Sequence, residues 1–450
     1  MSEKRKRRNS SANSIKMMPR NENYRNIRTA QGRTAAAPRR AAAAGTAGAA
    51  ARRSAAAGAV ASRSTAIRAV PPTRKAKKKT WVRSGFDYPL FTIVIVLLAF
   101  GIIMMFSASY ATAFSSTGDS MYYLKRQAVF AIGGLVIMMI LSTIDYHIFQ
   151  SKVMVYGIGA LSIGLLLAVF VIGKVQNGAG RWLEIGEITF QPSEILKLAV
   201  IIFFAYFAEK YFSRLREFKR GFLPLAAVLA ISCGILMAQP HLSGTIIVFS
   251  IGFSMMFVAG VNLKHLFLML GGLVLLVVIA ILLLNAMGIN YFSDRILSFT
   301  NPEADIDDST FQTYQSLVTI GSGGLFGLGF GNSRQKYGYM PMSRNDFVFS
   351  IICEELGFVG AVLVILLFVI FVWRGFHICT RARDKFGMML AFGITFQIGL
   401  QALLNIAVVT NSIPNTGISL PFFSYGGTAL VMQLAEMGML LSVSRKAELD

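Results

Sequence analysis

Apolar runs of about twenty residues recur along this 450-residue chain from Tyr88 onward, which is the length that a helix needs to cross a bilayer. Apolar residues make up 54% of the sequence and charged residues only 15%. A soluble core does not require such runs, whereas hydrocarbon requires helices that satisfy their own backbone groups. The sequence therefore predicts an all-α protein that crosses a membrane many times.

Hydropathy predicts ten spans, and the Gln239-Pro240 pair separates the fifth from the sixth. A connection of about 60 residues, 288–345, joins the seventh and eighth spans, and its length marks it as a functional candidate. The predicted spans lie near 88–107, 125–143, 153–173, 192–209, 221–238, 243–261, 265–287, 346–373, 386–410 and 422–443.

Basic residues cluster at 210–220, 374–385 and 445–446, after the fourth, eighth and tenth spans. The positive-inside rule places these clusters, and therefore both termini, on the cytoplasmic face of the cytoplasmic membrane. The connections 174–191 and 288–345 then lie outside the cell, so we expect extracytoplasmic chemistry.

The basic charge belongs to the segment 1–84, which carries 22 Lys and Arg residues against two acids and so holds +20 of the net +22. Its Ala, Arg, Ser and Gly composition lacks large apolar residues, which predicts a disordered cytoplasmic tail ahead of a membrane domain, 85–450. Two interpretations remain open: a solvated tail, or one that attaches to anionic lipids. We expect no nucleic-acid partner, because no aromatic platform accompanies the charge.

Acids at a membrane boundary narrow the candidate site, because hydrocarbon penalises a carboxylate by about 2.5 kcal/mol or more. Asp346 stands where the long connection enters the eighth span, and we interpret it as a catalytic base. Glu354 and Glu355 lie about two turns further along, where helix packing is the better interpretation. His241 and His265 have no partners at ligand spacing and are interpreted as ordinary boundary residues.

Cationic side chains supply the second half of the candidate site. Glu194 and Lys197 are three residues apart at the start of the fourth span, so they share a helix face and can pair. This pair is either a structural link between helices or, with Arg181, a donor set for an anionic group such as a diphosphate. Three further basic residues are expected to join this substrate-binding set: Arg126, Lys336 and Arg344.

The glycines of GSGGLFGLGFGNS, 321–333, do not form a nucleotide-binding loop, because the Lys-Ser/Thr ending and a preceding strand are missing. We expect flexible backbone that packs closely over a cavity. No cysteine or histidine spacing predicts a dedicated metal site.

Four motifs in order resemble the signatures of the SEDS family of cell-wall polymerases, across essentially all of 85–446. The ending of the chain resembles the FtsW and SpoVE branch more than the RodA branch. The motifs are GAGRWLEIG with FQPSEILKLA, YQSLVTIGSGGLFGLGFGNSRQKYGYMP, NDFVFSIICEELG and IPNTGISLPFFSYGGTAL.

This resemblance implies a ten-helix enzyme that polymerises lipid II beside a class B penicillin-binding protein. It acts either with other division proteins at the septum or in spore-wall synthesis. The resemblance assigns the essential acid to Asp346, and it includes Glu194, Lys197 and Arg181 among the family's motif residues. Two positions depart from the family pattern, because His241 and Met342 stand where acids are common.

The implied chemistry fits the residues, since glycosyl transfer needs a base for the acceptor hydroxyl and positive charge for the departing diphosphate. Burial against Phe347 and Phe349 is expected to raise the pKa of Asp346. The sequence indicates no certain cofactor, and a Mg²⁺ or Mn²⁺ ion is compatible with a diphosphate substrate. A lipid II flippase and a noncatalytic division scaffold remain the alternatives.

Overall fold

The computed structural model describes residues 85–176, 179–186, 188–286, 299–303, 310–340 and 342–447. The predicted tail, 1–84, lies outside these described residues. Within them, nine helices are long and apolar enough to cross a membrane. They are α1 (Tyr88–Thr117), α2 (Tyr122–Thr143), α3 (Lys152–Ile172), α5 (Leu223–Ala238), α6 (Leu242–Ala259), α7 (Leu263–Ala286), α10 (Val348–Arg381), α11 (Lys385–Val409) and α12 (Gly427–Lys446).

A further helix, α4 (Pro192–Lys210), occupies the position of the predicted fourth span. Its 19 residues include four charged side chains, which is why apolarity alone does not mark it as a span. Most of α4 is buried among other helices and not exposed to lipid. A short helix, α9 (Phe311–Ser322), lies within the long connection between α7 and α10.

Several helix ends differ from the predicted boundaries. The first span was predicted to end at 107, but α1 continues to Thr117 through small and hydroxylated residues that suit a helix without being strongly apolar. The last span was predicted to begin at 422, but α12 begins at Gly427, because Phe422 adopts a positive φ of 66° within a turn. The sequence therefore located the helices better than their ends.

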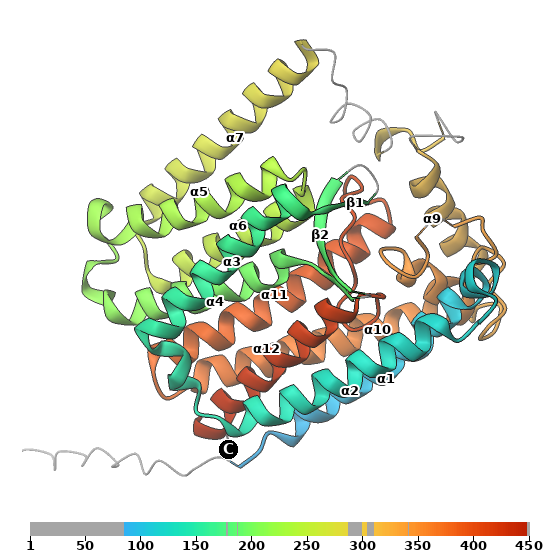
Figure 1. Cartoon of the computed structure of the whole chain (residues 1–450), viewed down its shortest axis with the longest axis horizontal. Coiled ribbons are helices and arrows are strands. Elements are labelled where there is room, and N and C mark those ends of the chain that lie inside the picture. Colours follow the sequence, from blue (N-terminus) through green and yellow to red (C-terminus); the bar gives the residue numbers. More distant parts are fainter. Residues whose placement is uncertain are drawn as a thin grey trace, which may run out of the picture. The chain divides into compact units, whose positions relative to one another are not determined.

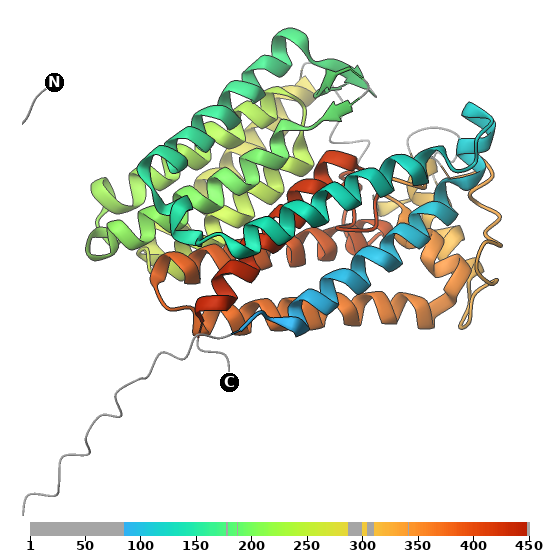
Figure 2. The same ribbon diagram turned by 60° about the horizontal axis from the view of Figure 1, so that its bottom comes forward.

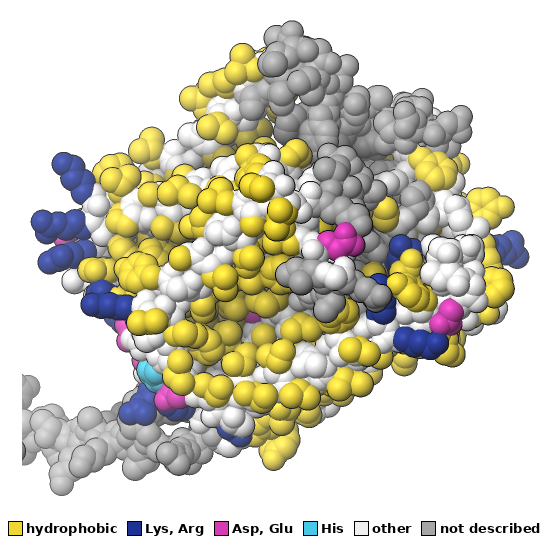
Figure 3. Space-filling view, in the orientation of Figure 1, with side chains coloured by type: hydrophobic (Ala, Val, Ile, Leu, Met, Phe, Trp, Pro, Cys, Tyr) yellow, Lys and Arg dark blue, Asp and Glu magenta, His cyan; other side chains and the backbone are white. Residues whose placement is uncertain are grey.

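The centre of the bundle is formed by α4, α11 and α12, and α2, α3, α6 and α10 pack around these three helices. The helix α12 packs along α2, α11 lies between α10 and α4, and α3 covers the opposite side of α4. Figure 1 shows α7 extending away from the other helices, and its main neighbour is α6. In Figure 3, apolar side chains cover the flanks of the helices while Lys and Arg gather toward their ends, as a bilayer requires.

The helix α10 is interrupted at Gly357, whose φ of 67° and ψ of −164° are not helical. Such a break frees backbone groups, and inside a membrane these groups need partners. The glycine-rich stretch supplies them: Leu328 N–H donates to Glu354 O (2.9 Å) and Phe358 N–H donates to Gly324 O (2.9 Å). Residues 321–333 do not line the cavity described below, and their glycine backbone packs closely against the break in α10.

The prediction of an all-α protein needs one correction, because the connection 174–191 contains a three-stranded sheet. Strands β1 (Lys174–Gln176), β2 (Ala179–Ile185) and β3 (Ile188–Phe190) pair antiparallel in the order β1-β2-β3. Leu183 pairs with Phe190 in this sheet. The strands are too short to give a clear alternating pattern, yet they place β2 close to the start of α4.

Candidate active site

A polar cavity of about 470 Å³ opens among the ends of several elements. Its wall combines β2, the start of α4, the connection between α5 and α6, the residues before α10, and parts of α11 and α12. The segment 417–426, between α11 and α12, completes the wall. Five of the seven residues predicted for the site line this one cavity: Arg181, Glu194, Lys197, Arg344 and Asp346.

Asp346 lies two residues before the first residue of α10, so its carboxylate belongs to the loop and faces the cavity. The side chain keeps some contact with the cavity but is otherwise enclosed by protein. Loss of solvation raises the pKa of Asp346 to about 6, while the Arg181 guanidinium acts in the opposite direction. A carboxylate with this pKa is ionised at neutral pH and is a stronger base than an exposed aspartate.

Glu194 and Lys197 form the predicted ion pair in the first turns of α4, with Nζ 2.9 Å from the Glu194 carboxylate. Lys197 is also held by Gln401 of α11, whose Oε1 accepts from Nζ at 3.1 Å. Both members of the pair are buried in the bundle and line the cavity. The Lys197 ammonium is therefore held at the buried wall of the cavity. The low dielectric there strengthens its attraction for a bound anion.

Arg181 and Arg344 add two guanidinium groups to the cavity wall, one from β2 and one from the loop before α10. Arg181 of β2 donates from Nη2 to the carbonyl oxygen of Pro240, in the connection between α5 and α6. Arg344 lies over the ring of Tyr123, 4.2 Å from its centroid, and its carbonyl oxygen accepts from Tyr425 N–H at 2.8 Å. The cavity thus brings together one acid with a raised pKa and three cationic side chains.

Two predicted members of the substrate-binding set do not line this cavity. Arg126 donates from Nη1 to Tyr122 OH at 2.8 Å, within α2. Lys336 lies in a separate buried cluster, where Nζ is 3.0 Å from Glu355 and donates to Gly331 O at 2.6 Å. The placement of Lys336 in the same site was therefore wrong, because the loop folds back against α1 and α10.

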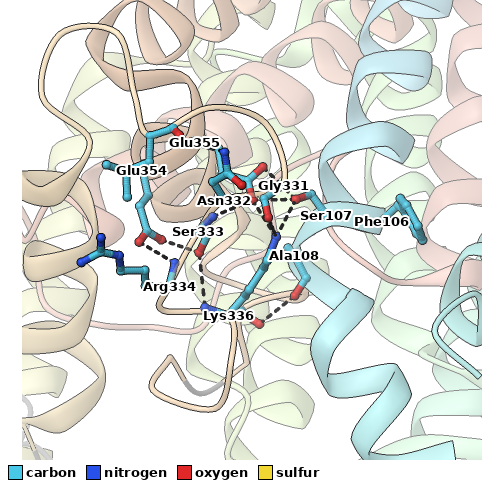
Figure 4. Close-up of polar contacts among 12 residues, drawn as sticks. Phe106, Ser107, Ala108, Gly331, Asn332, Ser333, Arg334, Lys336, Glu354 and Glu355 are labelled. Atoms are coloured by element: carbon cyan, nitrogen blue, oxygen red, sulfur yellow. Dashed lines mark hydrogen bonds and ion pairs between the residues drawn. The ribbon is translucent and has the colours of Figure 1, made fainter. Parts of the chain in front are cut away.

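Both carboxylate oxygens of Glu354 and of Glu355 accept hydrogen bonds within that cluster (Figure 4). Ser107 of α1 donates to both oxygens of Glu355, at 2.6 and 2.7 Å. Glu354 accepts from the Ser333 hydroxyl and from Arg334 N–H (2.9 Å). The interpretation of these two acids as packing residues agrees with this geometry.

The sequence did not identify several residues that line or support the cavity. His241 was interpreted as an ordinary boundary residue, yet it is buried in the cavity wall with its Nε2 3.3 Å from Gln191. Burial, together with Arg181 and Lys197, lowers the pKa of His241 to about 3, so the imidazole is neutral. In the sequence, His241 stands out only as the last residue of the Gln239-Pro240-His241 segment that precedes α6.

The fold and the cavity define a class of protein: a polytopic helical membrane protein with an acid and several cations at the ends of its helices. The chain belongs to the FtsW/RodA/SpoVE family, described as cell cycle proteins, whose model matches residues 88–449. The probable peptidoglycan glycosyltransferase FtsW of Geobacter sp. (strain M18) is 36% identical, over 80% of this chain and 97% of its own length. Stage V sporulation protein E of Bacillus subtilis (strain 168) is 39% identical, over 81% and 99%.

Solved structures give the same relationship. A chain of a peptidoglycan synthase complex that coordinates polymerization and crosslinking matches with a TM-score of 0.66 and 27% identity, covering 81% of this chain and 99% of that one. The rod shape determining protein RodA of Thermus thermophilus matches with a TM-score of 0.58 and 27% identity, over 81% and 98%.

Proposed function

We propose that this protein is a peptidoglycan glycosyltransferase that polymerises lipid II into glycan strands. Its relatives include proteins named as glycosyltransferases of this kind, and its family is shared with FtsW and SpoVE. The observation that carries the proposal is a buried carboxylate, Asp346, in one cavity with Arg181 and Lys197. A scaffold alone does not require a carboxylate that faces a cavity with cationic side chains.

In the proposed reaction, Asp346 takes the proton of the acceptor sugar hydroxyl as its oxygen attacks the anomeric carbon of the donor. The new glycosidic bond forms while the bond from that carbon to the lipid diphosphate breaks, and the diphosphate leaves with the bonding electrons. Arg181 and Lys197 stabilise the charge that develops on the diphosphate. Glu194 fixes the position of Lys197 through their 2.9 Å ion pair.

Arg344 and Arg126 are proposed to extend the anion-binding surface toward the mouth of the cavity. Arg344 lines the cavity, and its guanidinium lies over Tyr123 of α2. Arg126 is held by Tyr122 of the same helix. A substrate with a diphosphate and a carboxylate-bearing peptide offers an anion to each of these regions.

The proposed membrane arrangement has ten spans, with α4 as the tenth crossing because its charged side chains are shielded inside the bundle. Basic residues after α4 and α10 favour cytoplasmic termini, which places the cavity on the outer face. The septum is the proposed location, and a class B penicillin-binding protein is the proposed partner, which fits the similarity to a chain of a peptidoglycan synthase complex. The basic tail is proposed to remain in the cytoplasm, with anionic lipids as its candidate partner.

No resident cofactor is proposed. The described residues contain no group of three or more His, Cys, Asp or Glu side chains that could hold a metal ion. A Mg²⁺ or Mn²⁺ ion would instead enter with the diphosphate, whose oxygens are suitable ligands.

The test is to incubate the purified protein, with its partner, with lipid II in detergent and to separate the products by length. Detergent removes the two sides of a membrane, so a pure flippase or scaffold yields no product there. We expect glycan strands. Unchanged lipid II, in the presence of partner protein that is shown to bind, would contradict the proposal.

A further inference from the structure

Two buried amide side chains on α11 connect the candidate base to the candidate cation. Gln401 and Asn405 are four residues apart, so they project from the same face of the helix. Gln401 is 3% exposed and Asn405 is fully buried. Burying an amide group costs free energy unless hydrogen bonds within the protein replace those to water. The hydrogen bonds of these two side chains therefore matter for the structure of the site.

Asn405 uses both protons of its amide group at the candidate base. Its Nδ2 donates to the carbonyl oxygen of Asp346 at 2.7 Å and to that of Ile418 at 2.6 Å. The first helical bond of α10 runs from Ser350 N–H to Phe347 O, so it does not use the Asp346 carbonyl. Asn405 therefore supplies a donor to a carbonyl that lies just before the helix begins.

The hydrogen bond from Asn405 to the Ile418 carbonyl also positions the loop next to the Asp346 carboxylate. Gly417 directly precedes Ile418 and has a φ of 68°, and a Cβ added there would lie 3.3 Å from Asp346 Oδ2. A side chain at position 417 would thus contact the carboxylate, so the loop backbone lies close to Asp346. Asn405 holds the main chain of the base and the loop that encloses its side chain.

Gln401 makes the corresponding connection at the cation. Its Oε1 accepts from Lys197 Nζ at 3.1 Å, and its Nε2 donates to Ser419 O at 3.1 Å and Ser419 Oγ at 3.2 Å. Ser419 follows Ile418, which Asn405 holds. One turn of a rigid helix therefore links α4, the loop 417–419 and the start of α10.

We propose that Asn405 and Gln401 are positioning residues that set the separation between the Asp346 carboxylate and the Lys197 ammonium and keep the carboxylate desolvated. The inference rests on the proposed glycosyltransferase function. Asn405 does not line the cavity and acts through Asp346 and Ile418, whereas Gln401 lies in the cavity wall and holds Lys197. Misplacement of a reacting group by about 1 Å can reduce a rate about 100-fold.

The test compares Asn405→Leu with wild-type protein in the lipid II assay. Leucine has a similar size but donates no hydrogen bond, so Asp346 and the loop 417–419 separate and water reaches the carboxylate. We expect kcat to fall about 100-fold while KM changes less than about threefold. The acid limb of the pH–rate profile, expected near pH 6 in the wild type, should move to lower pH.

Thr395→Val is the matched control, since Thr395 lies buried on the same helix and its hydroxyl has no hydrogen-bond partner among the residues that the structure describes. It should leave kcat and the acid limb unchanged. If Asn405→Leu does not fold, Asn405→Thr keeps one donor and should produce a smaller shift in the same direction. A folded Asn405 variant with wild-type kcat, or with reduced kcat and an unmoved acid limb, would overturn the proposal.

A measurement without substrate separates this inference from the proposed function. Infrared titration of the carboxyl band that is lost in Asp346→Asn reports the ionisation of Asp346 directly. The positioning proposal expects a lower titration midpoint in Asn405→Leu even if the wild-type protein makes no glycan. An unchanged midpoint would contradict it, whereas absence of glycan alone would contradict the enzymatic function.

Discussion

Two buried Lys–Glu ion pairs in this protein have nearly the same geometry but different surroundings. Lys197 lies 2.9 Å from Glu194, and Lys336 lies 3.0 Å from Glu355. Both lysine side chains are 3% exposed. The sequence predicted a role in substrate binding for both lysines, yet only Lys197 lines the cavity.

The difference lies in what surrounds each acid. The Glu355 side chain is fully buried, and Ser107 and the Ser333 backbone donate to it, so no face remains for a ligand. The Glu194 side chain keeps 11% exposure and lines the cavity with its lysine. Pairing and burial therefore do not identify a functional charge; an open face toward a cavity does.

The largest expected effect on stability is at the enclosed pair. Glu355→Gln removes one partner and leaves the Lys336 ammonium without its counter-ion, which typically costs about 3–5 kcal/mol. We expect a large loss of thermal stability in detergent, with activity per folded molecule close to wild type. The double variant with Lys336→Met should recover much of the stability, and equal loss in both variants would argue against an ion-pair cost.

The pair in the cavity should respond in the opposite way. Lys197→Met removes a donor to the departing diphosphate, and removal of one such donor typically lowers kcat about 100-fold or more. Stability should change less than in Glu355→Gln, because Glu194 remains next to the cavity. Lys336→Met is the matched control, and equal activity of the two methionine variants would remove the distinction between the pairs.

The sequence predicted the part of the structure that depends on local properties. Apolar runs located the helices, because hydrocarbon imposes length and composition on each span separately. The i, i+3 spacing predicted the Glu194–Lys197 pair, because both residues belong to one helix. Asp346 was found because an acid at a membrane boundary needs a reason.

Features that depend on long-range contacts could not be predicted in this way. Lys336 is 229 residues from its partner Ser107, so no local pattern connects them. Asn405 lies 59 residues from Asp346 in the sequence, and its contact with Asp346 arises only when the loop folds over α11. The break at Gly357 likewise depends on backbone partners from the glycine-rich stretch.

The most direct test of the account is glycan-strand formation from lipid II by purified Asp346→Asn protein with its partner. Asparagine keeps the shape of the side chain but cannot accept the proton of the acceptor hydroxyl, so we expect product formation to fall at least about 1,000-fold. The variant should remain folded, since Asp346 has no ion-pair partner among the described residues that this change would strand. Wild-type turnover by folded Asp346→Asn protein would contradict the assignment of Asp346 as the base.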